Sequence, residues 1–384
     1  MSMPTGSGKS GVAELAVAQA LARGWVVYLA PTRALVRQVR RDLRHALGPD
    51  VEVREFLGGA EFTTLADDSL VTNPGRTVLV MTPEKCSLAL RQSPESFASL
   101  ALCVFDECHL IGEPRNRGVL AELVVAQILE RAPQVTVVMQ SALMGNTEDV
   151  AAWLRQATGR PCQSIQEPWR PTRTLRAVAG FDEAGAERAE ELAVQDLATQ
   201  PRKVHLKFEA PMNLLVSLQG AWTHDDPADY ALARTTLTAP LTVSRTDDGF
   251  TTSTEGYVND ATGSVARGLA EVGHRVLAFI PANKHYSFSV ARKVGGFGNQ
   301  RDPENPDWGA VEHFLDLADF ELGVPSVLRE LIEKGVAVHT SAMLLEERRA
   351  SELAYDRGFA RIVFATGTLA QGLNLPATAV VIGG

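Results

Sequence analysis

Two spacings of apolar residues alternate along the amino-terminal part of the chain, and each predicts a different element. Near-continuous apolar runs of strand length lie at 25–30, 78–81, 101–105 and 135–139. In the intervening stretches 10–23 and 32–47, apolar residues recur three or four positions apart, as they do along one face of a helix. Apolar strands separated by helices are typical of a parallel sheet that is covered on both faces. We therefore predict a first α/β lobe over residues 1–178.

The same alternation returns near the carboxyl end of the chain. Strand-length apolar runs lie at 275–280, 336–339, 361–365 and 378–382, with a helical stretch at 344–356. They predict a second α/β lobe over residues 263–384. Between the lobes, a charged helix at 182–198 leads into a Thr-rich stretch in which Asp247-Asp248-Gly249 is a hairpin turn signal. We predict a linker and a β-rich insert over residues 179–262, without a catalytic signature.

The composition limits what this protein can be. At 384 residues, with 45% hydrophobic and 22% charged residues, the chain can fill two cores and present a polar surface. It has no apolar run long enough to cross a bilayer and no signal segment at its start, so we expect no membrane partner. Four cysteines without paired spacing argue against a zinc site and favour a cytoplasmic location. The net charge of −9 excludes an overall basic protein, but a local cleft can still bind nucleic acid.

The first chemical motif is the segment Pro4-Thr5-Gly6-Ser7-Gly8-Lys9-Ser10, directly before the first predicted helix. Gly6 and Gly8 allow backbone N–H groups to close around phosphate oxygens, and the positive end of the helix faces the same anion. Lys9 can reach the β- and γ-phosphates of a nucleotide, and the Ser10 hydroxyl can ligate Mg²⁺. We therefore predict a site for ATP and Mg²⁺ formed by Thr5, Gly6, Ser7, Gly8, Lys9 and Ser10.

An acidic pair follows the third apolar run, in the segment Phe105-Asp106-Glu107-Cys108-His109. Ligand sites in open α/β sheets form where the strands end. Asp106 is placed to hold Mg²⁺, and Glu107 to orient or deprotonate the attacking water. The alternative is that the two acids only cap the next helix. The phosphate-binding segment upstream favours the catalytic interpretation.

Seven segments, in order, resemble the motifs of superfamily-two DExH helicases, closest to the Ski-like branch. They are PTGSGKS (4–10, motif I), APTRALVRQ (30–38, Ia), TPEK (82–85, Ib), DECH (106–109, II), SAL (141–143, III), RVLAFIPANK (275–284, IV) and ATGTLAQGLNLPA (365–377, V). The segment HLIGEPRNRG (109–118) also resembles the Ski-like group. The resemblance implies two RecA-like P-loop NTPase lobes and an ATP-dependent helicase or translocase. DNA or RNA would be the partner, with a single strand held across both lobes.

The resemblance also implies roles for individual residues. The sugar–phosphate backbone would be contacted by Pro31, Thr32, Arg33, Thr82, Thr366 and Thr368. The second lobe would face the nucleotide through Gly372 and Asn374. His109 would take part in catalysis by bridging the ATP site to motif III, where Leu143 stands in place of the usual threonine.

Simpler interpretations remain open for several of these residues. Motif V can be an ordinary turn, His109 an ordinary helix cap, and Gly58-Gly59 either a plain turn or a point of close backbone approach. The arginines on the helix at 32–47 form a basic stripe, and such stripes are usually solvated faces. Within it, Arg33 lies at the strand-to-helix turn and is the better candidate for phosphate contact, whereas Arg41 and Arg44 are better explained as solvated.

Both ends of the sequence differ from the helicase pattern. Only Met1–Met3 precede the phosphate-binding segment, so we expect the strand that normally enters it to be absent. The sequence stops after 378–382, without the arginine-rich motif VI. We hypothesise that the chain is a fragment of a larger helicase with further domains. Two functions remain open, an ATP-driven helicase or a non-catalytic nucleotide- or nucleic-acid-binding scaffold, and a P-loop kinase or GTPase is disfavoured by motifs Ia, Ib and V.

Overall fold

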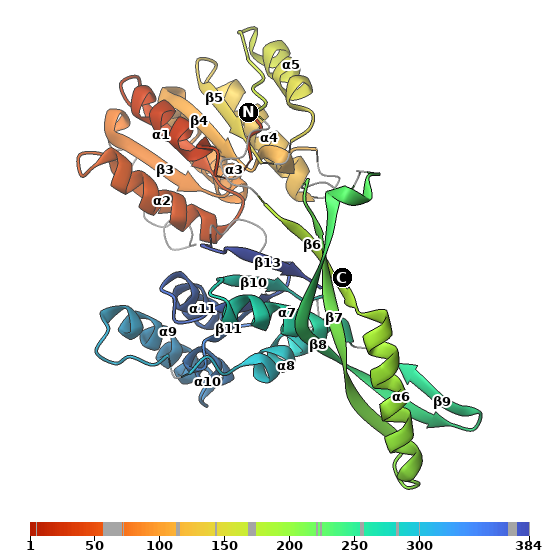
Figure 1. Ribbon diagram of the computed structural model, residues 1–384. Coiled ribbons are helices and arrows are strands. Elements are labelled where there is room, and N and C mark those ends of the chain that lie inside the picture. Colours follow the sequence, from red (N-terminus) through yellow and green to blue (C-terminus); the bar gives the residue numbers. More distant parts are fainter. Residues whose placement is uncertain are drawn as a thin grey trace. The chain divides into compact units, whose positions relative to one another are not determined.

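The structure is a computed structural model that divides into two compact units (Figure 1). It describes residues 1–4, 6–56, 71, 73–112, 116–142, 144–167, 174–219, 222, 225–253, 257–281, 284–298, 300–367 and 375–383. The first unit comprises Met1–Arg173, and the second comprises Thr174–Ala370 with Asn374–Gly384. Among the helices in those ranges, none combines the length and the apolarity needed to cross a membrane.

A five-stranded parallel sheet forms the centre of the first unit, in the order β2-β3-β1-β4-β5. The strands are β1 (Trp25–Leu29), β2 (Glu52–Phe56), β3 (Thr77–Met81), β4 (Leu100–Asp106) and β5 (Thr136–Gln140). The register places Val27 of β1 opposite Leu79 of β3 and Cys103 of β4. Every residue of β1 and β3 is buried, as the unbroken apolar runs predicted. The sequence analysis did not predict β2, which lies at the edge of the sheet and contains only two apolar residues, Val53 and Phe56.

Helices cover both faces of this sheet. The helices are α1 (Lys9–Ala20), α2 (Arg33–Leu47), α3 (Pro83–Gln92), α4 (Asn116–Arg131) and α5 (Thr147–Thr158), with short 3-10 turns η3 (Pro74–Arg76), η4 (Pro94–Ser99) and η5 (Cys108–Leu110). On one face, α1 and α2 pack onto Val26 and Val104 through residues such as Val17 and Val36. On the other face, α3, α4 and α5 bury Trp25 and their own apolar sides. The predicted parallel sheet with two covered faces is confirmed.

Met1–Met3 lie beside the end of β5 without being a strand of the sheet. Ser2 forms parallel bridges with Ser141 on one side and Gln166 on the other. The backbone N–H of Met3 donates to the carbonyl oxygen of Ser141 at 3.0 Å, and that of Ser2 donates to Ile165 at 2.8 Å. Among the described residues no strand is assigned before α1, as expected, although Met1–Met3 make isolated bridges and hydrogen bonds on both sides.

The second unit contains a four-stranded parallel sheet in the order β11-β12-β10-β13. The strands are β10 (Val276–Phe279), β11 (Val336–His339), β12 (Ile362–Ala365) and β13 (Ala379–Ile382). The accompanying helices are α7 (Tyr257–Glu271), α8 (Lys284–Val294), α9 (Pro306–Leu322), α10 (Val327–Glu333) and α11 (Leu345–Asp356). All four strands fall on the apolar runs from which they were predicted. The fold class, two parallel-sheet lobes, is thereby confirmed.

The predicted β-rich insert is an antiparallel sheet in the order β6-β7-β8-β9. It consists of β6 (Arg176–Phe181), helix α6 (Glu183–Thr199), β7 (His205–Ser217), the 3-10 turn η6 (Pro227–Asp229), β8 (Tyr230–Thr246) and β9 (Gly249–Ser253). Asp247 and Asp248 make the turn between β8 and β9, as predicted. In the middle of the insert, Met212 and Ala239 pack against Ala261 and Val265 of α7. The insert is thus joined to the core of the second unit.

Candidate functional site

The phosphate-binding segment connects the extended Met1–Met3 to α1. Gly6 (φ 82°) and Gly8 (φ 97°) adopt left-handed backbone conformations, which side-chain-bearing residues rarely tolerate. Lys9 begins α1, and its Nζ donates hydrogen bonds to the carbonyl oxygens of Met3 (2.7 Å) and Pro4 (3.1 Å). The loop therefore curls around the Lys9 ammonium group.

Other residues of this segment complete the loop. The Ser7 hydroxyl donates to the carbonyl oxygen of Pro4 at 2.6 Å, which closes the turn. Ser10 lies in the first turn of α1 and is exposed. Thr5, also predicted to bind the nucleotide, lies outside the described residues.

Asp106 lies at the end of β4, where it faces Lys9. Its Oδ1 accepts a hydrogen bond from the backbone N–H of Glu107 at 2.9 Å, and its Oδ2 accepts one from the Tyr28 hydroxyl at 3.1 Å. The Gln140 side-chain amide in turn donates to the Tyr28 oxygen at 2.9 Å. Three neighbouring strands, β1, β4 and β5, thus contribute one polar residue each to a continuous hydrogen-bonded chain.

Burial shifts the pKa values of the residues in and beside this hydrogen-bonded series. It raises the pKa of Asp106, against the opposing effects of its hydrogen bonds and of the Lys9 ammonium. It raises the pKa of Tyr28 well above its usual value, and the Asp106 charge adds to the rise, so Tyr28 remains a hydrogen-bond donor. Burial also lowers the pKa of Lys9, while the carboxylates of Glu107 and Asp106 act in the opposite direction. These mutual effects place the lysine and the two acids in one electrostatic cluster.

Glu107 adopts a left-handed conformation (φ 50°, ψ 44°) and is the one non-glycine residue with positive φ in the described part of the chain. Such strain costs on the order of 1–3 kcal/mol and persists where the surroundings impose it. Partial burial raises the pKa of Glu107, and the nearby Asp106 charge raises it further. A carboxylate with a raised pKa at a strained position is typical of a catalytic base.

His109 lies between Glu107 and the segment after β5. Its Nδ1 is 3.2 Å from Oε2 of Glu107 and 3.0 Å from Oγ of Ser141. Ser141 is fully buried and also pairs with Ser2, directly before the phosphate-binding segment. The histidine therefore connects the acidic pair with the SAL segment, of which Leu143 lies outside the described residues.

A second group of predicted residues lies where β1 and β3 end. The Thr32 hydroxyl caps α2 by accepting a hydrogen bond from the backbone N–H of Leu35 at 3.2 Å. The Thr82 hydroxyl caps α3 in the same way, accepting from Lys85 at 3.4 Å. Two helix N-termini, which attract anions, thus face one region of the surface.

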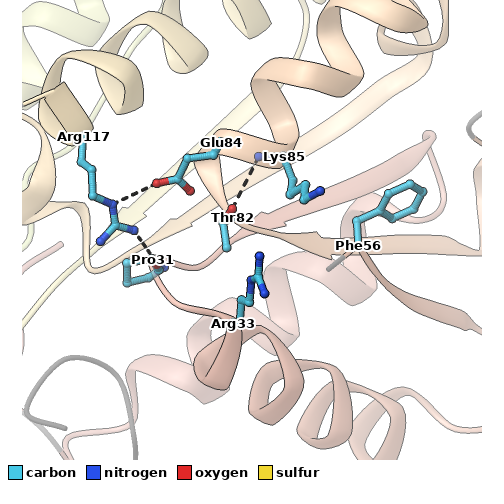
Figure 2. A pocket seen from close by; sticks show the side chains of 7 residues that line it. All are labelled: Pro31, Arg33, Phe56, Thr82, Glu84, Lys85 and Arg117. Carbon is cyan, nitrogen blue, oxygen red and sulfur yellow. Dashed lines mark hydrogen bonds and ion pairs between the residues drawn. The ribbon is translucent and has the colours of Figure 1, made fainter. Parts of the chain in front are cut away.

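These residues surround a cavity of 260 Å³ (Figure 2). The lining residues are Pro31, Arg33, Phe56, Thr82, Glu84, Lys85 and Arg117. Pockets that enclose a whole small molecule usually measure about 300–1,000 Å³. This cavity is smaller and carries three cationic side chains, so it suits one anionic group of a larger ligand.

The sequence analysis missed four residues of this cavity: Phe56, Lys85 and the ion-paired residues Glu84 and Arg117. The Arg117 guanidinium donates through Nε to Oε1 of Glu84 at 2.9 Å and through Nη2 to the carbonyl oxygen of Pro31 (Figure 2). Both residues lie in segments that resemble family motifs, TPEK and HLIGEPRNRG, but nothing in the sequence indicated that they meet. Tyr28 and Gln140 were missed for the same reason, and the only available signal was a polar residue in an otherwise apolar strand.

The remaining predicted residues are placed only in part. Thr366 follows β12 and is buried, and its backbone N–H donates to the carbonyl oxygen of His339. Thr368, Gly372 and Asn374 lie outside the described residues, as does Gly58-Gly59. Along the arginine stripe of α2, Arg40 pairs with Glu55 and Arg41 with Asp42, whereas Arg33 lines the cavity.

The matching family model and two similar proteins found by comparison are described as helicases. Residues 1–150 match the family model described as DEAD/DEAH box helicase. Across 99% of its length the chain is 25% identical to the ATP-dependent RNA helicase mtr4 of Schizosaccharomyces pombe, of which it covers 31%. Across 98% of its length it is 27% identical to the ATP-dependent DNA helicase Hel308 of Pyrobaculum calidifontis, of which it covers 43%. The chain thus spans less than half the length of these relatives.

Among solved structures, the chain is similar to the helicase Lhr of Mycobacterium smegmatis, bound to ssDNA and AMP-PNP. The match has a TM-score of 0.54 with 18% sequence identity, and it covers 100% of this chain and 39% of that one. At this identity the likeness bears on the fold alone. It supports the same two-lobed α/β architecture.

Proposed function

Because the chain carries a DEAD/DEAH box helicase domain and its relatives are Ski-like helicases of superfamily two, we propose that it uses ATP hydrolysis to move along, or unwind, a nucleic acid. The observation that carries this proposal is the cluster of Lys9, Asp106, Glu107 and His109 at the carboxyl edge of one sheet. We further propose that the two parallel-sheet lobes form the motor. Their predicted bounds, 1–178 and 263–384 with the insert at 179–262, fall inside β6 and α7, so the elements shift each bound by a few residues.

In this proposal the loop around Lys9 binds the triphosphate. The left-handed Gly6 and Gly8 leave the backbone N–H groups free of side-chain obstruction, and Lys9 exchanges its carbonyl partners for phosphate oxygens. Ser10 and Asp106 would hold Mg²⁺, which neutralises phosphate charge when bound. Their hydroxyl and carboxylate oxygens suit this ion, because it binds through one or two carboxylates together with phosphate oxygens.

Glu107 would orient the attacking water and accept its proton. Its strained backbone and its raised pKa both support this role. The position of Glu107 is fixed by His109, which also contacts Ser141. A movement of Ser141 would therefore shift Glu107 through the His109 side chain.

The nucleic-acid backbone would occupy the cavity of the first unit, against Pro31, Thr32, Arg33 and Thr82. By the resemblance of motif V, Thr366 and Thr368 would contact nucleic acid, and Gly372 and Asn374 the nucleotide. The named relatives include both an RNA helicase and a DNA helicase, and backbone contacts alone do not select between them.

Phosphate release from ATP, measured with and without single-stranded oligonucleotides of DNA and of RNA, tests this proposal. We expect stimulation by at least one of the two, and its loss in both Lys9→Ala and Glu107→Gln. Glu107→Gln should still bind nucleotide, whereas Lys9→Ala should bind it weakly. Phosphate release that neither substitution changes would show that the proposed site is not the catalytic one.

A further inference from the structure

Glu84 is an unexpected residue in a cavity that otherwise attracts anions. The other charged groups of the cavity, Arg33, Lys85 and Arg117, are cationic, and the N-termini of α2 and α3 add partial positive charge. A carboxylate beside a nucleic-acid phosphate would repel it. Glu84 therefore opposes the phosphate binding that its cationic neighbours favour, and its role has to be sought in its contact with one of those neighbours.

The pairing of Glu84 with Arg117 is well formed but exposed. The Nε–Oε1 distance is 2.9 Å, while 42% of the Glu84 side chain and 45% of the Arg117 side chain are accessible to solvent. Ion pairs this exposed contribute little to the stability of a fold. Stability alone is thus a weak explanation for a carboxylate at this position, and the pair can open at low cost.

The guanidinium has a second contact that does not depend on Glu84. Its Nη2 donates to the carbonyl oxygen of Pro31, at the turn between β1 and α2. This contact keeps the group at the cavity when its other partner changes. An arginine has five N–H donors in a rigid fork, so Nε can exchange a carboxylate for a phosphate while Nη2 stays in place.

We propose that Glu84 is an internal counter-ion of Arg117, which a backbone phosphate of the nucleic acid displaces when the strand enters the cavity. The inference rests on the proposed function and deepens it, because it names a residue that weakens strand binding. Glu84 lowers the affinity in two ways, by occupying Nε of Arg117 and by repelling phosphate. A motor benefits from such a residue, since a strand held too tightly cannot advance.

The charge state of Glu84 is consistent with this role. Partial burial raises the pKa of Glu84. Hydrogen bonds outweigh that effect and leave the pKa below its usual value; they come from Thr82, from its own backbone amide and from Arg117. Glu84 is therefore ionised at neutral pH and acts as a full counter-charge.

Equilibrium binding of a fluorescent single-stranded oligonucleotide to the whole chain, over a series of salt concentrations, tests the proposal. Glu84→Gln should bind about 5-fold more tightly, as expected for removing one charge about 4 Å from a phosphate in a water-like medium. The salt dependence should steepen by about 0.7 in the log–log slope, because the cavity then presents one more uncompensated positive charge to the strand. Arg117→Ala should bind more weakly, and Arg117→Lys should restore part of the loss.

The matched control is Glu148→Gln. Glu148 also forms an exposed pair with an arginine, Arg155, at 2.6 Å on α5, but it does not line the cavity. Its substitution should leave the strand affinity unchanged. Unchanged or weaker binding by Glu84→Gln, in a protein that binds the strand and melts like the wild type, would overturn the inference and leave the proposed function standing. If no variant and no wild-type protein binds a strand, both the inference and the proposed function fail.

Discussion

The cluster around Lys9 and Asp106, proposed to bind nucleotide, and the cavity around Arg117, proposed to bind a strand, both lie where strands of one parallel sheet end, but their charged groups are arranged differently. Around Asp106 the polar groups are buried and joined by hydrogen bonds, with Tyr28 3% exposed and Gln140 1% exposed. Around Arg117 the charged groups are exposed, and their ion pair can be exchanged. Chemistry on a phosphate needs fixed groups. A strand that must move needs contacts that form and break easily.

The largest expected effect comes from making one chemical change in both regions. Glu107→Gln should lower the rate of ATP hydrolysis about 10²- to 10⁴-fold, the usual contribution of a positioned base. Glu84→Gln should leave the maximal rate near that of the wild type and alter the strand concentration at half-stimulation. Steady-state phosphate release over a range of oligonucleotide concentrations separates the two. A similar loss of rate in both variants would contradict the assignment of catalysis to Glu107 and of strand binding to Glu84.

The second effect concerns the buried hydrogen bonds that link Gln140, Tyr28 and Asp106. Tyr28→Phe removes the hydroxyl that joins Gln140 to the Asp106 carboxylate. Losing such an outer partner typically weakens metal binding about 10- to 100-fold. We expect the Mg²⁺ concentration at half-maximal hydrolysis to rise by that factor, with strand affinity unchanged. An unaltered Mg²⁺ requirement would mean that the Tyr28 contact does not position Asp106 for the metal.

The third effect separates the two ends of the arginine stripe on α2. Arg33 lines the cavity, whereas Arg44 lies three turns away in the last turn of the helix. Arg33→Ala should weaken binding of a single strand about 5-fold, as expected for losing one charge near a phosphate. Arg44→Ala provides the control and should bind like the wild type. Equal losses in both variants would indicate general electrostatic attraction rather than a defined contact.

The smallest effect is on stability, and it depends on pH. The folded-state pKa of Glu107 is raised by burial and by Asp106, so folding is favoured by this group when it is protonated and disfavoured once it ionises. Removing the charge in Glu107→Gln should therefore raise the melting temperature at neutral pH. The gain should disappear as the pH falls below the usual range of a glutamate. Thermal melts at several pH values check this, and a gain that stays constant down to acid pH would exclude charge as the cause.

The sequence predicted most of the fold because most strands of both lobes are rich in apolar residues. Near-continuous apolar runs identified β1, β3, β4 and β5, whereas β2 was missed because this edge strand contains three charged residues among five. The three residues Met1–Met3 were too few to show a pattern, and backbone hydrogen bonds with Met139, Ser141, Ile165 and Glu167 hold them in place.

For the site, local motifs predicted Lys9, Asp106 and Glu107 as the residues that act on phosphate, because they lie in short segments with recognisable spacing. The sequence could not identify the partners that orient them. Tyr28 and Asp106 are 78 positions apart, and Arg117 and Glu84 are 33 apart. Whether such residues meet depends on strand order and register, which emerge only when the sheet is assembled.

The central claim, that the two regions belong to one ATP-driven motor, is tested most directly by the coupling between their ligands. We propose to measure the affinity of a single-stranded oligonucleotide with and without a non-hydrolysable ATP analogue and Mg²⁺, in the wild type and in Lys9→Ala. The account predicts that the analogue changes the strand affinity of the wild type about 5- to 150-fold, as allosteric couplings usually do, and leaves Lys9→Ala unaffected. A wild-type strand affinity that is the same in the presence and absence of a bound analogue would contradict it.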